Sequence, residues 1–598
     1  MALLVTTALE WSWGEHEPLV FLGEWCRRYE RAAAWRVCEH GVVRNHWDDR
    51  IKLRRDHDYL RSLHDELFED LVAILGHLHG IDRPRRFWRI LLDPWLTRYL
   101  GVAFDRWENL RTVFDEHRIS GTIVRTDPPL VAPCGHLQFH ELVARDDWNH
   151  DFYAAILRYQ YADRCVLRER GMPWGGEDTS AVKGVSSVLW KTMTRLLRTA
   201  DGVAGALSRR NRVLFVSSYF PLAALVSLNL RLRQVPSLLL NEFAWPDRRF
   251  QSDKTDWALR ERISVHRTPR NRFETFLAGR LRSDLPQVLV ESFGSMRKQT
   301  EAIRLRPKVV VSANAHFFND LFKHWIAEQV NRGVSLVTVD HGGSLHPAFG
   351  LMDFEEDISE VKATWTRPYH PKHIQMPPTK IAGRRRFTPR GKRLLIIGME
   401  MPRYASAAWS GPIGAQSLVG FEDVCRLHDT LSEAPQRAVL VKPYPNQGWC
   451  THQRFVERLG PRKVSSSRRL DTVIRAARLI VCTYPQTTFS EAMASGAPTL
   501  LVYPRHLWET VSLFEPLVDL LHEEGMVFFD PRSAADHINR IWEDPLTWWQ
   551  SRPVRAARAR FEAEILNLGD DWLGPWVAFA TRMAASAVPT NDFRQRAA

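Results

Sequence analysis

Short apolar runs alternate with longer helix-like segments along most of the chain. In the first two thirds, such runs occur at 2–7, 19–25, 212–221, 237–245, 288–293, 308–320 and 335–343. From 212 onwards each run ends in small or polar residues. Runs without polar interruptions are typical of parallel strands that are buried on both faces of an α/β sheet. We therefore predict strands at these positions and an α/β fold.

A helical pattern replaces the strand pattern between about residues 56 and 207. At Tyr59–Gly80 apolar residues recur at spacings of three and four, and Gly80 is a suitable residue to end a helix. The segment 86–107 continues in the same style. We expect a large helical insertion in the N-terminal half.

The strand pattern restarts after a segment rich in proline and basic residues at 370–392. The later runs are at 393–403, 438–449, 479–496, 499–505 and 526–529. We predict an acceptor-binding α/β domain at 1–385, a nucleotide-sugar-binding α/β domain at 386–560, and a C-terminal helix and tail at 561–598. Ligands bind beyond the carboxyl ends of the strands in such folds, so the cleft between the two domains is the expected site.

The composition limits the classes of partner that the protein is expected to bind. Lys and Arg outnumber Asp and Glu by 82 to 69, which gives a formal net charge of +13. This charge favours an anionic partner such as a nucleotide, an acidic glycan or a membrane surface. No nucleic-acid-binding signature is present, so we expect no nucleic-acid partner. Some of the 23 Trp residues could stack on sugars.

The cysteines and the apolar content indicate the compartment. The seven Cys are scattered, without zinc spacing, which fits free thiols in a reducing environment. The N-terminus lacks the features of a signal peptide, and no run reaches the ~18 apolar residues of a membrane span. We predict a cytoplasmic protein that could contact the inner face of a membrane peripherally.

The stretch 481–509 contains the first candidate site. Thr488 and Glu491 have the spacing of a helix capping box, in which both side chains bind free backbone N–H groups. A helix that starts at the end of a strand is also an anion site, because its free N–H groups and its dipole favour phosphate. Thr487 and Thr488 could add hydroxyl donors, and Glu491 could bind a ribose or sugar hydroxyl.

Two further motifs lie at the predicted ends of strands. Lys442 ends an apolar strand and precedes a Pro-x-Pro turn, so its ammonium could neutralise a diphosphate or a carboxylate. His341 is followed by Gly342 and Gly343, which would let the backbone approach a ligand closely. His341 could act as a general base or as a hydrogen-bond donor.

Four weaker candidates complete the predicted site. Asp48 and Asp49 could hold the acceptor or act in acid–base catalysis, and Arg403 and Arg505 could contact phosphate. Asp48 and Asp49 could instead form a structural network with a neighbouring Arg. Common nucleotide-binding and hydrolase motifs are absent from the sequence. We predict neither a metal site nor a cofactor.

Several motifs taken together resemble a putative transferase family of bacterial O-antigen and surface-polysaccharide clusters. They are "FLGEWC", "HWDDR", "WRILLDPWL" with "FDRW", "DHGG", "KPYPNQGW" and "TYPQTTFSEAMASGAPTLLVYPRHLWE". More distantly, the Lys-Pro turn and the hydroxyl-rich helix start resemble GT-B glycosyltransferases of the capsule Kdo-transferase and bacterial sialyltransferase type. Those enzymes carry His where this chain has Tyr444, and a Ser pair where it has Thr487 and Thr488.

The resemblance implies a GT-B fold, with two Rossmann-like domains facing a cleft, and glycosyl transfer. The donor would be a nucleotide-sugar, including CMP-activated nonulosonate or Kdo-like acids. The acceptor would be a surface polysaccharide, an O-antigen, a lipid-linked glycan or a glycoprotein. Lys442, Tyr444, Thr487 and Thr488 would contact the donor. A CDP-glycerol-type polyol-phosphate transferase and a non-catalytic glycan- or nucleic-acid-binding protein stay open as alternatives.

Overall fold

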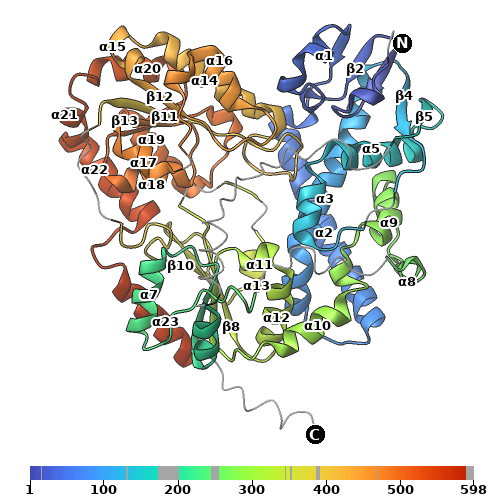
Figure 1. Ribbon diagram of the computed structural model, residues 1–598, viewed down its shortest axis with the longest axis horizontal. Coiled ribbons are helices and arrows are strands. Elements are labelled where there is room, and N and C mark those ends of the chain that lie inside the picture. The colour runs from blue at the N-terminus through green and yellow to red at the C-terminus, as the bar shows by residue number, and fades with distance from the viewer. Residues whose placement is uncertain are drawn as a thin grey trace.

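The protein is described here from a computed structural model. The described residues are 1–586 except 15–16, 130–131, 173–198, 200, 244–254, 344, 346, 351–352, 385–390 and 468. Within them the strands form three parallel sheets of five strands each. Figure 1 shows the three units that these sheets organise.

The first sheet lies in the N-terminal unit and has the strand order β3-β2-β1-β4-β5. Its strands are β1 (Ala2–Val5), β2 (Leu19–Phe21), β3 (His40–Val42), β4 (Ile119–Arg125) and β5 (Val166–Arg170). The helices of this unit are α1 (Ala32–Arg36), α2 (Arg50–His79), α3 (Arg85–Glu116), α4 (His136–Leu142) and α5 (Asp146–Gln160). This is the doubly wound order of a Rossmann-like half.

The second sheet has the order β10-β9-β8-β7-β6. Its strands are β6 (Val213–Val216), β7 (Val309–Ser312), β8 (Ser335–Val339), β9 (Val361–Thr364) and β10 (His373–Gln375). The helices in this part of the chain are α7 (Leu222–Arg231), α8 (Trp257–Glu261), α9 (Arg272–Asp284), α10 (Phe293–Ala302), α11 (Ala315–Phe318), α12 (Asp320–Asn331) and α13 (Glu355–Ile358).

The third sheet has the order β12-β11-β13-β14-β15. Its strands are β11 (Arg393–Ile397), β12 (Val439–Lys442), β13 (Ala477–Cys482), β14 (Thr499–Val502) and β15 (Val527–Phe528). Its helices are α14 (Ser417–Thr430), α15 (Glu433–Ala438), α16 (Thr451–Leu459), α17 (Leu470–Arg475), α18 (Thr487–Ser495), α19 (Glu515–Glu523), α20 (Pro531–Ile541), α21 (Pro545–Gln550) and α22 (Arg552–Phe561).

Both faces of the second and third sheets are buried, as their apolar runs predict. In β11, Leu395 and Ile397 belong to one hydrophobic core, whereas Leu394 and Ile396 belong to the core on the opposite face. This split follows from the two-residue period of a strand. The second sheet divides in the same way, with one face joining the core of the N-terminal unit and the other packing under α7 and α23 (Leu573–Ser586).

The three units are tied together by helices and by the C-terminal chain. Helices α2 and α3 run down one side of the molecule, and α3 packs on α12 of the second unit. After α22 the chain returns to the second unit, where α23 lies beside α7 (Figure 1). No helix among the described residues is both long enough and apolar enough to cross a membrane.

The observed fold refines several predictions. The α/β, GT-B-like arrangement is confirmed, because the carboxyl ends of the second and third sheets meet in one site, described below. The predicted helical insertion at 56–207 is mostly helical where described, but it also contains β4 and β5, so the N-terminal unit has a sheet of its own. Strand β5 gave no apolar run because most of its residues are exposed.

Two predicted strands are wrong. The described part of 237–245 is turn and coil, and 288–293 forms a 3-10 turn and the start of α10. Both segments supply buried apolar residues, and a short apolar run cannot by itself distinguish a strand from a buried turn. The predicted domain boundary at 385/386 and the tail at 587–598 lie outside the described residues.

Candidate functional site

The carboxyl ends of four neighbouring strands of the second sheet carry the first half of the site. Tyr219 follows β6, Asn314 follows β7, His341 follows β8 and Trp365 follows β9. The His341 Nε2 lies 3.3 Å from Asn314 Oδ1, and the His341 and Tyr219 rings meet edge to face at 5.7 Å. Tyr219 has a φ of 64°, a left-handed conformation that is rare for a bulky residue and is often found at functional sites.

Burial lowers the pKa of His341 from its ordinary value. Glu355 and Asp340 oppose this effect, while His316 and Lys362 add to it. The residues beneath His341 form a closed network, in which the Glu355 carboxylate contacts His316 Nε2 at 2.7 Å and Lys362 Nζ at 2.9 Å. This direction favours the neutral imidazole, which is the form that can accept a proton.

The loop after β8 packs directly on the start of α18 in the third unit. A Cβ added to Gly342 would lie 2.0 Å from Thr487 Oγ1, and one added to Gly343 would lie 2.5 Å from the Trp365 ring. Leu345 N also donates to the Pro485 carbonyl at 3.2 Å. The two glycines were predicted to admit a ligand. In the structure, Thr487 and Trp365 of the protein itself occupy the space beside these glycines. Because the glycines have no side chains, the second and third units can approach each other closely here.

Helix α18 begins at Thr487, and its N-cap, Gln486, makes no side-chain capping bond. The predicted capping box of Thr488 and Glu491 is therefore wrong. The hydroxyl groups of Thr488 and Tyr484 lie 2.5 Å apart. The backbone N–H groups of Thr487 and Thr488 have no partner among the described residues, since the first turn of a helix has none within the helix. The helix start presents free donors as an anion site does.

Two buried polar atoms near this contact also lack partners among the described residues. They are Ser490 Oγ, on the second turn of α18, and Trp365 Nε1, at the end of β9. An added Cβ on Gly343 would lie 3.3 Å from Ser490 Oγ. Unpaired buried polar atoms are uncommon in folded proteins and often mark a place for water or ligand. They cluster at the meeting point of the two sheets.

Lys442 ends β12, as predicted, and is half-buried. Its ammonium makes one hydrogen bond among the described residues, at 3.2 Å to the neighbouring carbonyl of Pro443. Burial lowers its pKa from the ordinary value, and no carboxylate of the described residues pairs with it. The ammonium therefore retains donors for an anion.

The third sheet sets the spacing between Lys442 and α18. Ile397 of β11 pairs with Lys442 on one side and with Cys482 of β13 on the other. Lys442 and the turn before α18 thus lie at the same edge of the sheet, two strands or ~10 Å apart. Tyr444 is 40% exposed. Burial is the main cause of the raised pKa of Tyr484, and Tyr444 lies close enough to Tyr484 to add to this shift.

Glu400, which the sequence analysis missed, shapes the turn after Lys442. Its buried carboxylate accepts hydrogen bonds from the backbone N–H groups of Gln447, Trp449 and Thr451 at 2.6, 2.9 and 3.3 Å. Glu400 lies three residues after β11, in the polar end of the predicted run 393–403, and this position was the available signal. Asn314 and Tyr219 were missed in the same way, although both lie in the polar ends of the predicted runs 308–320 and 212–221.

Glu491 and Arg505 lie in other surroundings than those predicted for a donor site. The buried Glu491 carboxylate pairs with Lys380 at 2.6 Å and with Arg384 at 3.1 Å. Arg505 is exposed, pairs with Asp519 at 3.2 Å and covers the Phe529 ring. Each has a protein partner that accounts for its charge.

Arg403, Asp48 and Asp49 hold the structure together. The buried Arg403 guanidinium bonds the Asp146 carboxylate at 2.5 Å and the Trp25 carbonyl at 2.7 Å, which ties the third unit to the first. Asp48 accepts a hydrogen bond from Gln416 at 2.9 Å. Asp49 caps α2 by accepting from the N–H groups of Ile51 and Lys52. These structural contacts explain why Arg403, Asp48 and Asp49 stand at these positions, without a catalytic role.

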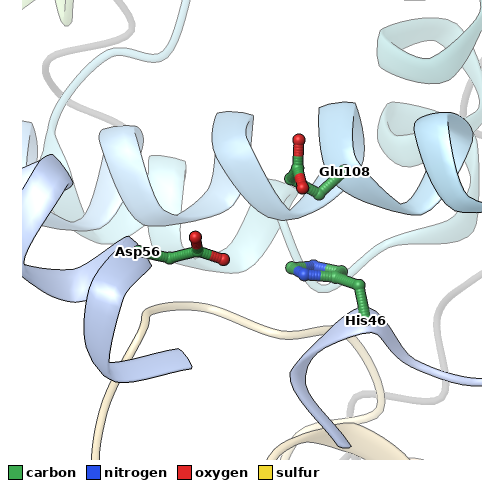
Figure 2. Close-up of side chains that lie close together, drawn as sticks. All are labelled: His46, Asp56 and Glu108. Carbon is green, nitrogen blue, oxygen red and sulfur yellow. The ribbon is translucent and has the colours of Figure 1, made fainter. Parts of the chain in front are cut away.

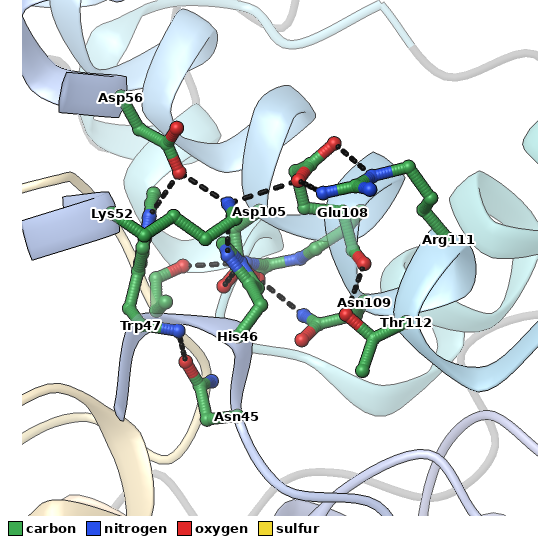
Figure 3. A network of polar contacts seen from close by, with 12 residues as sticks. Asn45, His46, Trp47, Lys52, Asp56, Asp105, Glu108, Asn109, Arg111 and Thr112 are labelled. Carbon is green, nitrogen blue, oxygen red and sulfur yellow. Dashed lines mark hydrogen bonds and ion pairs between the residues drawn. The ribbon is translucent and has the colours of Figure 1, made fainter. Parts of the chain in front are cut away.

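One group of the described residues has the geometry of metal ligands. Ligand atoms of His46, Asp56 and Glu108 lie within 4.8 Å of one another, and Figure 2 shows the three side chains converging. The Lys52 ammonium bonds all three, at 3.1 Å to His46 Nδ1 and 2.9 Å to Glu108, and Figure 3 shows it among them. The Lys52 ammonium occupies the position that a metal ion would take. We therefore assign the cluster a structural role in joining α2 to α3.

The fold and the site together define the class. Two Rossmann-like units meet at the carboxyl ends of their strands, with helix donors unpaired among the described residues, a half-buried lysine and a buried histidine at that edge. The model of the LIC12162 family transferase matches residues 2–579, so the chain belongs to this family of transferases. No curated protein matches the chain.

Solved structures show only distant similarity. The glycosyltransferase SnogD from Streptomyces nogalater is 15% identical over 63% of this chain and 99% of its own, with a TM-score of 0.34. The S. aureus MnaA–UDP co-structure is 10% identical over 63% and 96%, with a TM-score of 0.32. WaaG, a glycosyltransferase involved in lipopolysaccharide biosynthesis, is 12% identical over 62% and 99%, with a TM-score of 0.27. Similarity at this level establishes no shared ligand.

Proposed function

We propose that this transferase is a glycosyltransferase that moves a sugar from a nucleotide-sugar to a surface-polysaccharide, O-antigen, lipid-linked glycan or glycoprotein acceptor. One observation carries the proposal: the His341 loop packs on Thr487, the first residue of α18. A proton acceptor and an anion-binding helix start are thereby neighbours across two sheets. This pairing matches the needs of a reaction that deprotonates a hydroxyl and expels a phosphate.

On the donor side, the free N–H groups of α18 and the Lys442 ammonium would bind the phosphates. Thr487, Thr488 and Tyr444 would add hydroxyl contacts. Preorganised donors of this kind stabilise charge that develops on a leaving group, and removing one typically costs ~10²–10³ in kcat. The proposal needs no metal ion or cofactor for this step, because the helix and the lysine supply the positive charge.

In the proposed reaction, an acceptor hydroxyl oxygen attacks the anomeric carbon of the donor sugar. A glycosidic bond forms, and the bond between that carbon and the phosphate oxygen breaks. The electron pair leaves with the nucleotide, and the hydroxyl proton goes to His341. The lowered pKa of His341 keeps it unprotonated for this task.

A cavity beside the second and third units supports an acceptor site. It has a volume of about 330 Å³ and lies between α2, α3, the segment after β8 and the segment after β11. His57, Arg61, Arg89, Asp353 and Ala407 are among its lining residues. Charged and imidazole groups of this kind bind hydroxyl-rich ligands well, and the volume lies within the range of small-molecule sites.

A panel of nucleotides tests the donor half of the proposal. Thermal unfolding of the full chain is measured with CMP, UDP, GDP and CDP, and with CDP-glycerol for the polyol-phosphate alternative. A ligand at 100 times its Kd stabilises the folded state by ~2.7 kcal/mol, so one of them should raise Tm by several degrees. Donor identity, including a CMP-activated acid, then follows from mass spectrometry of the products.

The Lys442→Ala variant supplies the matched comparison. It should lose most of the nucleotide-induced shift in Tm, while Lys392→Ala, which removes an exposed lysine of the same unit, should keep it. The proposal is wrong if no nucleotide raises Tm, or if Lys442→Ala responds as the parent does. Cytoplasmic localisation with peripheral membrane contact stays a prediction from the sequence.

A further inference from the structure

A second cavity lies at the opposite edge of the second sheet from His341. It has a volume of about 410 Å³ and is bounded by the end of α10, the segment before β7, the C-terminal half of α12 and Arg83. Those segments precede the amino ends of β7 and β8, whereas His341 follows the carboxyl end of β8. The cavity is therefore about one strand length, or ~16 Å, from the proposed catalytic edge.

Arginine dominates the lining of this cavity. Five arginines face two glutamates, and the arginines are Arg83, Arg297, Arg304, Arg306 and Arg332. Arg83 pairs with Glu328 at 3.2 Å, and Arg297 pairs with Glu301 at 3.3 Å. The other three form no ion pair with the described residues, so they leave about three positive charges uncompensated around one cavity.

The buried wall of the cavity also offers a donor. Trp325 is fully buried, lines the cavity, and its Nε1 has no hydrogen-bond partner among the described residues. The Nε of Arg83 is likewise buried and unpaired. Both groups donate hydrogen bonds and accept none, which matches a ligand rich in acceptor oxygens.

Helix ends explain only part of this charge. Cations are favourable at the C-terminus of a helix, and α10 and α12 both end at this cavity. That effect accounts for about one arginine at each helix end, such as Arg332 beside α12. It does not account for three unpaired guanidinium groups and an unpaired indole N–H around the same volume.

We propose that this cavity binds a phosphoryl or pyrophosphoryl group, carried by a small phosphorylated molecule or by a lipid headgroup. Guanidinium groups bind phosphate oxygens in paired, charge-assisted hydrogen bonds. The volume lies within the range of small-molecule sites. The site is separate from the proposed donor site and does not depend on it.

Pyrophosphate is the first probe. It is titrated calorimetrically into the full chain carrying Lys442→Ala, so that the proposed donor site contributes little. The triple variant Arg304→Gln/Arg306→Gln/Arg332→Gln should weaken binding at least tenfold. A control triple variant, Arg231→Gln/Arg262→Gln/Arg555→Gln, removes the same charge from three arginines that are exposed like the first set but do not line the cavity, and it should change affinity less than threefold. Trp325→Phe should weaken binding several-fold while the protein stays folded.

Vesicles are the second probe and distinguish the two sources of phosphate. The full chain is sedimented with vesicles of phosphatidylglycerol and, separately, of phosphatidylcholine alone. Pyrophosphate binding without sedimentation indicates a small phosphorylated ligand. A lipid headgroup is indicated if the chain sediments with the anionic vesicles, the first triple variant does not, and the control triple variant does. The proposal is overturned if neither probe binds, or if both triple variants behave alike.

Discussion

The third unit contacts both other units, and the polar groups at these two contacts differ in whether they are paired. Against the first unit, Arg403 and Asp146 satisfy each other, and Arg50 pairs with Glu509 at 2.5 Å. Against the second unit, the N–H groups at the start of α18, Ser490 Oγ and Trp365 Nε1 stay without partners among the described residues. The contact with the first unit is closed by these pairs, whereas the strand-end part of the contact with the second unit leaves donors unpaired among the described residues.

The difference follows from the cost of burying polar groups. A buried group without a partner costs ~1–3 kcal/mol, so proteins normally pair such groups internally. The interface between the first and third units obeys this rule and therefore stabilises the assembly. The contact between the second and third units departs from it at the strand ends where α/β proteins bind ligands. In this protein, whether a polar side chain has a hydrogen-bond or ion-pair partner distinguishes structural from functional candidates better than its residue type does.

The largest expected effect is on catalysis at the open contact. His341→Ala should lower turnover ~10²–10⁴-fold, the usual contribution of a general base, with little change in Tm. In the parent enzyme kcat/KM should fall as pH drops through the lowered pKa of His341, because the base must be unprotonated. The acid limb should thus lie below the ordinary histidine value of ~6.5. Turnover that is unchanged in the variant would remove His341 from the mechanism.

The next effect concerns the closed contact. Arg403→Met removes the closest cation from the buried Asp146 carboxylate, which then keeps hydrogen bonds from Tyr404 and Ala8 N and a weaker contact with Arg28. The loss should destabilise the protein by up to ~3–5 kcal/mol. The loss is measured as a shift in the midpoint of urea unfolding. The double variant Arg403→Met/Asp146→Asn removes both charges and should recover part of the stability. If the single and double variants unfold alike, the pair does not hold the interface.

A smaller effect is expected where the two sheets touch at Gly342. Gly342→Ala places a Cβ against Thr487, and overpacking of this kind typically costs 1–3 kcal/mol. Nucleotide affinity should fall about tenfold, because the loop moves away from α18. Gly420→Ala adds the same methyl group in α14 of the third unit, where nothing lies within 4 Å, and should leave affinity unchanged. Equal behaviour of the two variants would show that the close approach is unimportant for binding.

The smallest effect tests the structural role of a residue that the sequence made a catalytic candidate. Asp49→Ala removes the N-cap of α2 and should destabilise the protein by about 1 kcal/mol, read from thermal unfolding. Turnover should stay within twofold of the parent. A hundredfold loss of turnover with unchanged stability would return Asp49 to the catalytic machinery and weaken the contrast between the two contacts.

The sequence analysis located the open contact better than the closed one. Lys442, Thr487 and His341 became candidates because an apolar run that ends in polar residues identifies the carboxyl end of a strand. That rule needs only local sequence. It would also have found Asn314 and Glu400, had every polar residue after a predicted strand been considered.

By itself the sequence determined the alternation of strands and helices, and hence which side chains stand at strand ends. Only the tertiary structure decided which of them keep unpaired polar groups. Arg403 is satisfied by Asp146 and Glu491 by Lys380, partners that lie far from them in the chain. Strand ends follow from local hydrophobic periodicity, whereas the pairing of a charge depends on where packing brings distant segments together.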